Sequence, residues 1–478
     1  MMLGSTSSIR KERQIMQKKA ELFFESIQNK KVTFIGMGVS HLDCIKLFVK
    51  KGIQVTVADK RTAEQLGENY QTLLKEGVRF ELGEDYLDHL YEADIIFRTP
   101  GMNFFSPALA KARELGKVVT SEMETFFDLC PCKLYAVTGS DGKTTTTTLI
   151  SEFLKAQGKT VHLGGNIGRA LLPIIETIRP EDVAVVELSS FQLISMRQSP
   201  DIAVITNVAP NHLDVHKDMD EYIGAKKNIY LHQNAFSKTV LNLDNEITCG
   251  MAGEIRGKLY QFSRRSVPKN GAYLSENGTI YMVNNGVETE VMKASDIRLP
   301  GIHNVENYLT AITAVYDDVD RNNLVKVARE FGGVEHRIEF VRELDGVKYY
   351  NDSIATSPTR VIAGLNAFDQ KLIVIAGGYD KKIPFEPLAP KLIEKCKLLI
   401  LMGLTADKIE KAVTECDGYS ADTLKILRVS SMEEAVMTAK KEAVEGDIVT
   451  LSPACASFDR YPNFEVRGNH YKGLVKNL

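Results

Sequence analysis

The sequence predicts an α/β protein of three domains: a Rossmann-like N-terminal domain, a central domain with a parallel sheet, and a Rossmann-like C-terminal domain. The chain has 478 residues, which suits about three domains of about 150 residues each. Short apolar, β-branched runs alternate with stretches of helical spacing, and glycine follows many of these runs, as at strand ends in doubly wound sheets. We expect the domains to span residues 1–130, 131–334 and 335–478.

The composition is that of an ordinary globular protein, with 44% apolar residues, 25% charged residues and a net charge of −3. It offers no basic field for nucleic acid or for an acidic membrane surface. No apolar stretch approaches the ~18 residues that span a bilayer, and no signal peptide is visible. The seven cysteines are scattered, and we interpret them as reduced thiols, including the close pair Cys130 and Cys132. We therefore predict a cytoplasmic protein with no nucleic-acid partner and no membrane insertion.

A βαβ pattern begins the first domain. A strand at Lys31–Ile35 ends in Gly36-Met37-Gly38, and a second strand at Gln54–Asp59 follows one helix later. Asp59 stands where a dinucleotide-binding fold places its ribose ligand, but His41 replaces the third glycine of that fingerprint. An NAD-dependent dehydrogenase is therefore one open interpretation.

A further strand, Asp94–Arg98, ends in the loop Thr99-Pro100-Gly101. Doubly wound sheets bind their ligands at the carboxyl edge of the strands, where this loop would lie. We expect a nucleotide-like ligand here, and the sequence leaves its identity open.

The stretch from Leu134 to Thr145 has the layout of a phosphate-binding loop. The apolar run Leu134–Thr138 gives way to Gly139-Ser140-Asp141-Gly142, then to Lys143 and Thr144, before helical spacing resumes. Glycines let backbone N–H groups turn toward an anion, and the helix N-terminus adds donors and a positive dipole end. Lys143 would reach the outer phosphates, and the Thr144 hydroxyl would hold Mg²⁺. Only the second half of the general pattern is present, because Val137 stands in place of its first glycine.

Five consecutive threonines, Thr144–Thr148, begin the helix that follows. Compared with alanine, this run costs about 2–3 kcal/mol of helix stability. An ordinary strand–turn–helix would use better helix formers, so we interpret the hydroxyls as facing phosphates and metal. The stretch predicts a nucleoside triphosphate site, either in an enzyme or in a nonenzymatic nucleotide switch.

Three later apolar runs are typical of buried parallel strands: Val183–Leu188, Ile202–Asn207 and Val240–Asp244. Glu187 closes the first run, where a nucleotide hydrolase fold would place a metal-binding carboxylate; a solvated surface charge is the alternative. The motif Asn211-His212-Leu213-Asp214, with His216 after it, follows the second run. It supplies candidate groups for metal binding or proton transfer.

The pattern starts again after a predicted hairpin at Tyr273–Val283, which alternates around Asn277-Gly278. Four strand candidates separated by helical stretches predict a second doubly wound sheet. They are Val347–Ser353, Leu372–Gly378, Leu398–Gly403 and Ile448–Pro453.

Six motifs occur in order along the chain: Thr138–Thr144, Gly165–Gly168, Glu187–Gln192, Asn211–Asp214, Gly301-x-His303-Asn304 and His336-Arg337. Together they resemble the Mur ligase family, the ATP-dependent amino-acid ligases of peptidoglycan assembly, over nearly the whole chain from about Lys31. The later motifs Asn351-Asp352-Ser353 and Ser452–Asp459 resemble the branch of this family that adds D-glutamate. The shortened phosphate loop is the form that the family uses.

The resemblance implies a central ATP-binding P-loop domain and two Mg²⁺ ions. The implied ATP contacts are Gly139, Ser140, Asp141, Gly142, Lys143, Thr144, Thr145, Asn304, Arg337 and Asp352. The implied metal site is formed by Thr144, Glu187, His212 and Lys226, of which Lys226 matches a lysine that the family carbamylates. The implied catalytic residues are Lys143, His212, Lys226 and Arg337, with His212 either a proton acceptor or a metal-site residue.

The resemblance also implies pockets for two further small-molecule substrates. Residues matching the pocket for UDP-N-acetylmuramoyl-L-alanine are Ser40, Asp59, Arg61, Thr99, Gly101 and Asn166. Residues matching the D-glutamate pocket are Thr356, Lys381, Ser457 and Phe464. Ile354 replaces a lysine that many members carry directly after Asn-Asp-Ser.

The implied reaction is ATP-dependent amide synthesis through an acyl phosphate, with release of ADP and phosphate, by a monomeric enzyme. The alternative within the family is a sister ligase, or a folylpolyglutamate-type ligase, with another amino acid or acceptor. The segment Ser452–Asp459 favours D-glutamate.

Overall fold

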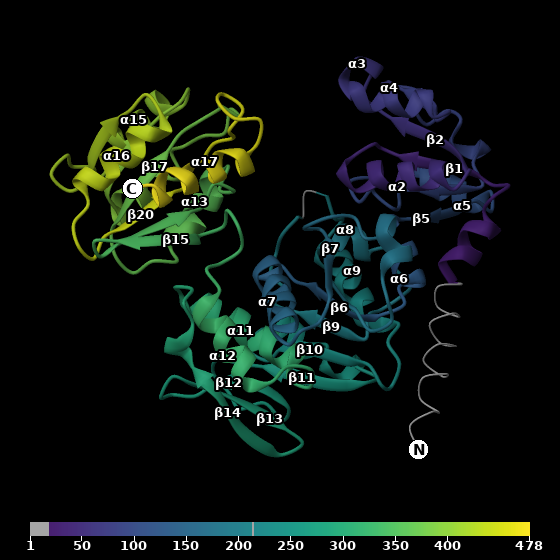
Figure 1. Cartoon of the computed structure of the whole chain (residues 1–478), viewed down its shortest axis with the longest axis horizontal. Helices are drawn as coiled ribbons and strands as arrows, with labels where there is room; N and C mark the ends of the chain where they lie inside the picture. Colours follow the sequence, from purple (N-terminus) through teal and green to yellow (C-terminus); the bar gives the residue numbers. More distant parts are fainter. Residues whose placement is uncertain (1–18, 213–214) are drawn as a thin grey trace. The chain divides into compact units, whose positions relative to one another are not determined.

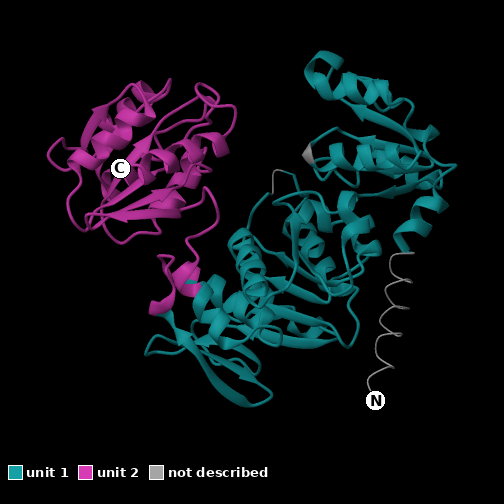
Figure 2. Cartoon of the chain, viewed as in Figure 1, with its two compact units in different colours: residues 1–294, 305–327 teal, residues 295–304, 328–478 magenta. Residues whose placement is uncertain are grey.

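The computed structural model describes residues 19–212 and 215–478. The chain divides into two compact units, residues 1–294 with 305–327 and residues 295–304 with 328–478 (Figure 2). Strands and helices alternate in both units, so the predicted α/β class is confirmed. The domain boundaries expected from the sequence, at 130/131 and 334/335, stay predictions.

A five-stranded parallel sheet forms the first part of unit 1 (Figure 1), with the strand order β3-β2-β1-β4-β5. Its strands are β1 (Lys31–Ile35), β2 (Gln54–Asp59), β3 (Arg79–Leu82), β4 (Ile95–Phe97) and β5 (Val118–Thr120). The chain order reverses between β1 and β4. In doubly wound sheets, ligands bind at the carboxyl ends of the strands that flank such a reversal.

A six-stranded parallel sheet forms the second part of unit 1, with the order β11-β10-β9-β6-β8-β7. Its strands are β6 (Lys133–Thr138), β7 (Val161–Gly165), β8 (Val183–Glu187), β9 (Ile202–Ile205), β10 (Lys238–Asn242) and β11 (Lys258–Phe262). Every residue of β8 and β9 is buried, as expected for strands covered on both faces. The predicted hairpin is confirmed in a small antiparallel sheet of β12 (Gly271–Leu274), β13 (Thr279–Asn284) and β14 (Val287–Lys293).

One hydrophobic core runs through both parallel sheets of unit 1, from Phe34, Phe48 and Phe97 to Val186 and Ile205. This shared core explains why the two sheets form one compact unit. Between residues 31 and 293 the α-helices are α2 (Val39–Lys50), α3 (Ala63–Leu66), α4 (Glu68–Lys75), α5 (Pro107–Glu114), α6 (Glu122–Leu129), α7 (Lys143–Ala156), α8 (Ser190–Leu193), α9 (Met219–Leu231) and α10 (Glu246–Gly250). Short 3₁₀ turns are η1 (Leu90–Glu92), η2 (Leu172–Thr177) and η3 (Ala252–Glu254), and the elements at the unit boundaries are η4 (Ala294–Asp296), α11 (Ile302–Val315) and α12 (Arg321–Glu330).

Unit 2 contains a six-stranded sheet with the order β15-β16-β20-β17-β18-β19, parallel except for the pair β15 and β16. Its strands are β15 (Glu339–Leu344), β16 (Val347–Asn351), β17 (Leu372–Ala376), β18 (Cys396–Leu401), β19 (Lys425–Arg428) and β20 (Ile448–Leu451). Its helices are α13 (Pro358–Leu365), α14 (Ala389–Lys395), α15 (Ala406–Thr414), α16 (Met432–Glu442) and α17 (Phe464–Lys476). Two separate hydrophobic cores, one around Val374 and one around Ile375, lie on the two faces of β17.

Candidate active site

The phosphate-loop residues lie between β6, an interior strand, and α7. Gly139 and Gly142 have φ angles of +151° and +75°, in the region that favours glycine. A Cβ atom on Gly139 would lie 1.9 Å from Thr206 Oγ1, and one on Gly142 would lie 2.4 Å from Asn307 Oδ1. Both positions therefore require glycine, for their backbone angles and for this close packing.

Hydrogen bonds fix the shape of this loop. Ser140 N donates to Asn207 O at 2.9 Å, and Asp141 N donates to Asn207 Oδ1 at 2.9 Å. Lys143 Nζ donates to Ser140 O at 2.9 Å, so the ammonium group lies against the loop. Helix α7 begins at Lys143, so its first N–H groups and its positive dipole end lie at the phosphate loop. The arrangement can bind a polyphosphate.

The threonine run differs from the expectation that its hydroxyls face phosphates. Thr147 Oγ1 donates to Lys143 O and Thr148 Oγ1 donates to Thr144 O, both at 2.8 Å, so these hydroxyls bond one turn back within α7. The buried Thr146 hydroxyl donates to Asn307 Oδ1 at 3.4 Å. Only the start of the run is therefore available to a ligand of the loop.

Glu187 ends β8 opposite Val137 of β6, beside the phosphate loop. Its side chain is buried, and Asn166 Nδ2 donates to its Oε1 at 2.7 Å. Among the described residues, its second carboxylate oxygen, Oε2, has no hydrogen-bond partner. A buried oxygen of this kind is a good ligand for a cation. Asn166, predicted as a contact of the UDP-linked substrate, is thus placed next to Glu187.

Lys226 lies on α9 with 1% of its surface exposed. Its Nζ donates to Gly139 O at 2.8 Å and lies 4.6 Å from the centre of the Tyr222 ring. Burial, followed by the nearby charge of Lys143, lowers the pKa of Lys226 to about 7. A large share of this amine is therefore neutral at neutral pH, which makes it a nucleophile.

His212 follows β9 with a φ angle of 56°, and its ring centre lies 5.2 Å from that of Phe191 on α8. Phe191 also stacks on the ring of His216 at 5.0 Å. His216 is buried, and its ring nitrogens lie 2.8 Å from Ser190 Oγ and 2.9 Å from Glu221 Oε1. These contacts give His216 a structural role, and Phe191 contacts both histidine rings. Leu213 and Asp214 of the same motif lie outside the described residues.

The predicted metal site mixes several donor types. Over residues 19–212 and 215–478, no three His, Cys, Asp or Glu side chains converge as a metal site would require. Glu187 and Lys226 lie beside the phosphate loop that precedes Thr144, whereas His212 is linked to this region through Phe191.

Asp59 lies at the end of β2, where the sequence predicted a contact to a nucleotide. Its carboxylate accepts hydrogen bonds from Met37 N at 2.7 Å, from Arg61 N at 2.9 Å and from Arg61 Nη2 at 2.6 Å. Burial alone would raise the pKa of Asp59, but these hydrogen bonds outweigh it and lower the pKa. A carboxylate bonded in this way holds the Gly36 turn and Arg61, and is a poor acceptor for ribose hydroxyls.

The loop Thr99–Gly101 lies beside the Gly36 turn, since a Cβ atom on Gly36 would lie 3.7 Å from Thr99 Cγ2. Ser40 is in the first turn of α2, which starts from the same turn. The predicted residues Ser40, Asp59, Arg61, Thr99 and Gly101 therefore share the carboxyl edge of the first sheet. This is the edge where doubly wound sheets bind ligands.

In unit 2, the structure brings two of the predicted D-glutamate residues into contact. Lys381 Nζ donates to Thr356 O and to Thr356 Oγ1, each at 3.3 Å. Ser457 is buried in the loop after β20, and Phe464 is the first residue of α17, where its carbonyl accepts from Ser353 Oγ at 2.8 Å. All four residues lie on loops at the carboxyl ends of strands or at the start of α17.

The other predicted ATP contacts, Asn304, Arg337 and Asp352, also belong to unit 2. Asn304 Nδ2 donates to Pro300 O at 2.7 Å. Asp352 accepts from Ser452 Oγ at 2.9 Å and from Ile338 N at 3.3 Å. Burial raises the pKa of Asp352 to about 7, while these hydrogen bonds and the charge of Arg337 oppose the rise.

Three family models match successive parts of the chain. The one described as "Mur ligase MurD-like, N-terminal domain" matches residues 30–121, "Mur ligase middle domain" matches 137–315, and "Mur ligase, glutamate ligase domain" matches 336–455. The chain belongs to the Mur ligase family. Mur ligases are ATP-dependent enzymes that form amide bonds, so the predicted family and enzyme class are confirmed.

Several relatives match over nearly the full length. The UDP-N-acetylmuramoylalanine--D-glutamate ligase of Acetivibrio thermocellus is 52% identical over 97% of this chain and 100% of its own length. The enzyme of the same name from Clostridium acetobutylicum is 51% identical over 97% of this chain and 100% of its own. Among solved structures, UDP-N-acetylmuramate-alanine ligase from Thermotoga maritima aligns with a TM-score of 0.56, covers 94% of this chain and 99% of its own, and shares 17% identity. That likeness shows the Mur ligase fold alone.

Two arginines of this Mur ligase were not singled out by the sequence. Arg98 is 1% exposed and donates from Nη2 to Phe191 O at 2.9 Å and to Ser195 Oγ at 2.6 Å, which ties the first sheet to α8. Arg467 on α17 is 3% exposed. The only sequence signal for Arg98 is its place directly after an apolar strand, and a single arginine there is usually solvated.

No helix among the described residues is long and apolar enough to cross a membrane.

Proposed function

We propose that this protein joins D-glutamate to UDP-N-acetylmuramoyl-L-alanine at the expense of ATP, releasing ADP and phosphate in peptidoglycan precursor synthesis. The observation that carries the proposal is the 52% identity to a UDP-N-acetylmuramoylalanine--D-glutamate ligase across 97% of this chain and 100% of that enzyme. The glycine-lined loop beside Lys143 supports it, since it can bind the phosphates of ATP.

The proposed reaction has two steps. A carboxylate is a poor acyl donor, so it must first be activated. The alanine carboxylate of the acceptor attacks the γ-phosphorus of ATP, which forms an acyl phosphate and releases ADP. The D-glutamate amine then attacks the acyl carbon, and the tetrahedral intermediate expels phosphate as the amide forms. Lys143 and Arg337 would balance the charge on the transferring phosphate, which is the largest catalytic contribution expected for such a site. His212 is the proposed proton acceptor or a metal-site residue.

We propose that Mg²⁺, as two ions, belongs to the same site. The residues that would hold it are Thr144, Glu187, His212 and Lys226, and the metal would neutralise phosphate charge. The buried Glu187 Oε2 without a partner fits a cation. The lowered pKa of Lys226 fits carbamylation, in which the neutral amine adds to carbon dioxide and loses a proton to form a carbamate with an anionic carboxyl end.

The proposal assigns the two remaining substrates to separate places. Ser40, Arg61, Thr99 and Gly101, with Asp59 holding Arg61 and Asn166 nearer the acceptor end, would bind UDP-N-acetylmuramoyl-L-alanine. Thr356, Lys381, Ser457 and Phe464 would bind D-glutamate, and the Lys381 ammonium would pair with its side-chain carboxylate. A monomer in the cytoplasm, where ATP and UDP-linked substrates are available, completes the proposal.

The alternatives differ in their substrates. A sister Mur or folylpolyglutamate-type ligase would use another amino acid or acceptor, a nucleotide switch would bind ATP without amide synthesis, and a dehydrogenase would bind NAD. The saturated Asp59 carboxylate speaks against an NAD ribose site. Phosphate release with ATP and UDP-N-acetylmuramoyl-L-alanine, scanned across D- and L-amino acids, tests the proposal. We expect stimulation by D-glutamate, and equal stimulation by an unrelated amino acid would contradict it.

Two substitutions separate the roles of the lysines. Lys143→Ala should abolish phosphate release with every amino acid, because the loop then lacks the cation beside the outer phosphates. Lys381→Ala should raise the KM for D-glutamate by about tenfold or more and leave the KM for ATP within about twofold. Steady-state phosphate-release kinetics measure both effects. Unchanged D-glutamate kinetics in Lys381→Ala would remove this residue from the pocket.

A further inference from the structure

Arg467 is a buried cation in the first turn of α17, with 3% of its surface exposed. Its guanidinium group makes four hydrogen bonds, all to neutral oxygens of two loops. Nε donates to Ser353 Oγ at 3.0 Å and Nη2 to Ser353 O at 2.9 Å. Nη1 donates to Cys455 O at 3.1 Å and to Ala456 O at 3.2 Å. One side chain therefore joins the turn after β16 to the loop after β20.

Each proposed D-glutamate residue lies close to a partner of this guanidinium. Thr356 lies three residues after Ser353, and Ser457 directly follows Ala456. Phe464 lies one helical turn before Arg467 on α17, and its carbonyl accepts from Ser353 Oγ at 2.8 Å.

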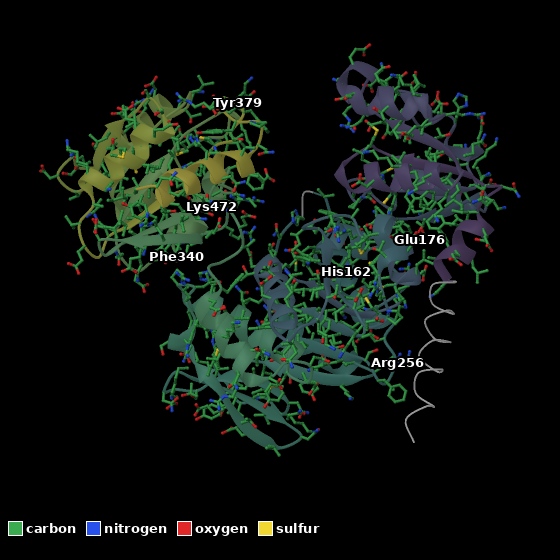
Figure 3. All side chains as sticks on the ribbon, viewed as in Figure 1. His162, Glu176, Arg256, Phe340, Tyr379 and Lys472 are labelled. Atoms are coloured by element: carbon green, nitrogen blue, oxygen red, sulfur yellow. The ribbon has the colours of Figure 1, made fainter. Side chains whose placement is uncertain are left out.

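Lys381 is connected through Tyr379, which lies two residues before it and is labelled in Figure 3. Tyr379 N donates to Ala456 O at 2.9 Å, the same carbonyl that Arg467 binds. The segment carrying Lys381 is thus hydrogen-bonded to the loop that carries Ser457. All four chain segments that hold proposed D-glutamate contacts are joined by hydrogen bonds that meet at one guanidinium group.

The far side of α17 is held independently. Lys472, also labelled in Figure 3, donates to Glu335 Oε1 at 2.5 Å and to Glu339 Oε1 at 3.0 Å. The helix therefore has a second attachment, so its position does not depend on Arg467 alone. A conservative change of Arg467 should disturb the loops more than the fold.

The surroundings of Arg467 favour precise geometry over stability. Burial lowers its pKa to about 10, with Cys455 and Asp459 opposing the change, so the group stays charged at neutral pH. A buried charge without a close carboxylate partner costs stability, and an apolar side chain would avoid that cost. Only a planar fork of several donors can bind carbonyls of two loops at once, and lysine cannot replace it.

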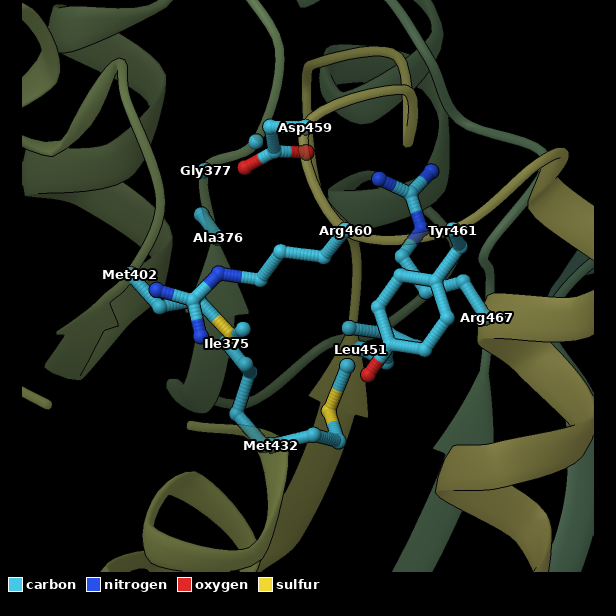
Figure 4. A pocket seen from close by; sticks show the side chains of 11 residues that line it. Ile375, Ala376, Gly377, Met402, Met432, Leu451, Asp459, Arg460, Tyr461 and Arg467 are labelled. Carbon is cyan, nitrogen blue, oxygen red and sulfur yellow. The ribbon is translucent and has the colours of Figure 1, made fainter. Parts of the chain in front are cut away.

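A pocket at the carboxyl ends of β17, β18 and β20 lies against the same group (Figure 4). Arg467 lines it together with Gly377, Gly378, Met402 and Asp459. Gly378 needs its small size here, because a Cβ atom would lie 2.4 Å from Ala456 O and 3.3 Å from Arg467 Nη1. The loops around the guanidinium are therefore packed at van der Waals contact, and a small shift of one is transmitted to the next.

We propose that Arg467 is a positioning residue that sets the mutual placement of the loops carrying Thr356, Lys381, Ser457 and Phe464, and thereby the affinity for D-glutamate. The inference rests on the proposed function. It adds a residue that touches no substrate and acts through the loop carbonyls.

The test compares Arg467→Lys and Arg467→Met with Arg460→Lys as a matched control. Arg460 is an exposed arginine of the same loop region, and it donates to Ser430 O. For each protein, KM is measured for D-glutamate, ATP and UDP-N-acetylmuramoyl-L-alanine. The acyl phosphate is measured separately, as the hydroxamate formed when hydroxylamine replaces D-glutamate, and Tm is recorded.

We expect Arg467→Lys to raise the KM for D-glutamate by about tenfold or more, since small misplacements of binding groups have effects of this size. Hydroxamate formation, the KM for ATP and the KM for the UDP-linked substrate should stay within about twofold. Arg467→Met should show the same pattern more strongly, and Arg460→Lys should match the unchanged protein.

An unaltered KM for D-glutamate in both Arg467 variants would overturn the role of this residue. The role would also be overturned if all three KM values rose together while hydroxamate formation and Tm fell. That pattern belongs to a purely structural residue. If the unchanged protein forms no hydroxamate and no D-glutamate product, the proposed function itself fails, and the inference fails with it.

Discussion

At the scale of single residues, buried ionisable groups mark the candidate site. Lys226, Glu187, Asp352 and Arg467 are all nearly inaccessible to solvent. Lys226 and Arg467 lie on helices, Glu187 ends β8 and Asp352 directly follows β16. Burying a charge lowers stability unless the group is paired, so such residues are retained where a ligand or a reaction needs them. In the sequence, Lys226 looks like any helix-surface lysine, and only the fold reveals its burial.

Asp352 yields a pH-dependent prediction. Its pKa is about 7 in the folded protein, against an ordinary value of 3.8. Between these pH values the unfolded chain loses the proton and the folded chain keeps it, so stability falls as the pH rises from about 4 to about 7. Asp352→Asn removes this loss, which is at most about 4 kcal/mol.

We therefore expect Asp352→Asn to raise Tm at pH 8 by several degrees relative to the unchanged protein, and by much less at pH 5. Thermal unfolding of the ligand-free proteins at both pH values measures the difference. A gain of the same size at both pH values would show that the Asp352 carboxyl group is not protonated by folding.

At the scale of elements, helix α7 explains how a poor helix-forming run is accommodated. The Thr147 and Thr148 hydroxyls bond to carbonyls one turn earlier, which satisfies them without any ligand. Only Thr144 is both in the first turn and partly accessible without such a role. In the sequence the five threonines form a single run, because identical residues cannot be told apart before the helical turn is known.

A pair of substitutions in α7 separates the two kinds of threonine. Thr148→Ala should leave phosphate release unchanged and raise helix stability by up to about 0.7 kcal/mol, as alanine is the better helix former. Thr144→Ala should lower phosphate release by about 100-fold, because it removes the proposed metal-binding hydroxyl. Rates and Tm are measured for both. Equal rate losses would contradict the separate roles.

The buried strands of the three large sheets were predictable, and their edge strands were not. The runs at β1, β6, β8, β17 and β20 are apolar and β-branched because they are covered on both faces. The edge strands β3, β15 and β19 contain mostly charged or half-exposed residues, so they lack that signal.

The site residues were predictable where a motif carries them, as at Gly139–Thr144. Arg98 and Arg467 were not, since an isolated arginine carries no pattern.

At the scale of the whole molecule, the two parallel sheets of unit 1 are joined by a polar contact as well as by their shared core. Arg98 follows β4 and binds the carbonyl of Phe191 and the hydroxyl of Ser195, and the buried Glu124 favours its charge. Phe191 in turn contacts His212. The loop Thr99–Gly101 and the region of Glu187 are thus held in one arrangement.

Arg98→Met should lower the free energy of unfolding by about 3 kcal/mol, because buried acceptors and Glu124 lose their partner. It should also raise the KM for UDP-N-acetylmuramoyl-L-alanine more than the KM for ATP. Arg113→Met is the control. The guanidinium groups of Arg98 and Arg113 both lie over the Phe104 ring, and Arg113 is the less buried of the two. Thermal unfolding and steady-state kinetics measure both. A Tm equal to that of the control would contradict a structural tie at Arg98.

The central claim is that this Mur ligase adds D-glutamate to a UDP-linked alanyl acceptor. Mass spectrometry of the product formed from UDP-N-acetylmuramoyl-L-alanine, ATP, Mg²⁺ and an equimolar mixture of D- and L-amino acids tests it most directly. We expect a single product, heavier than the acceptor by one glutamate less one water, and formed from the D isomer when each isomer is offered alone. A product carrying another amino acid, or an unmodified acceptor after ATP is consumed, would contradict it.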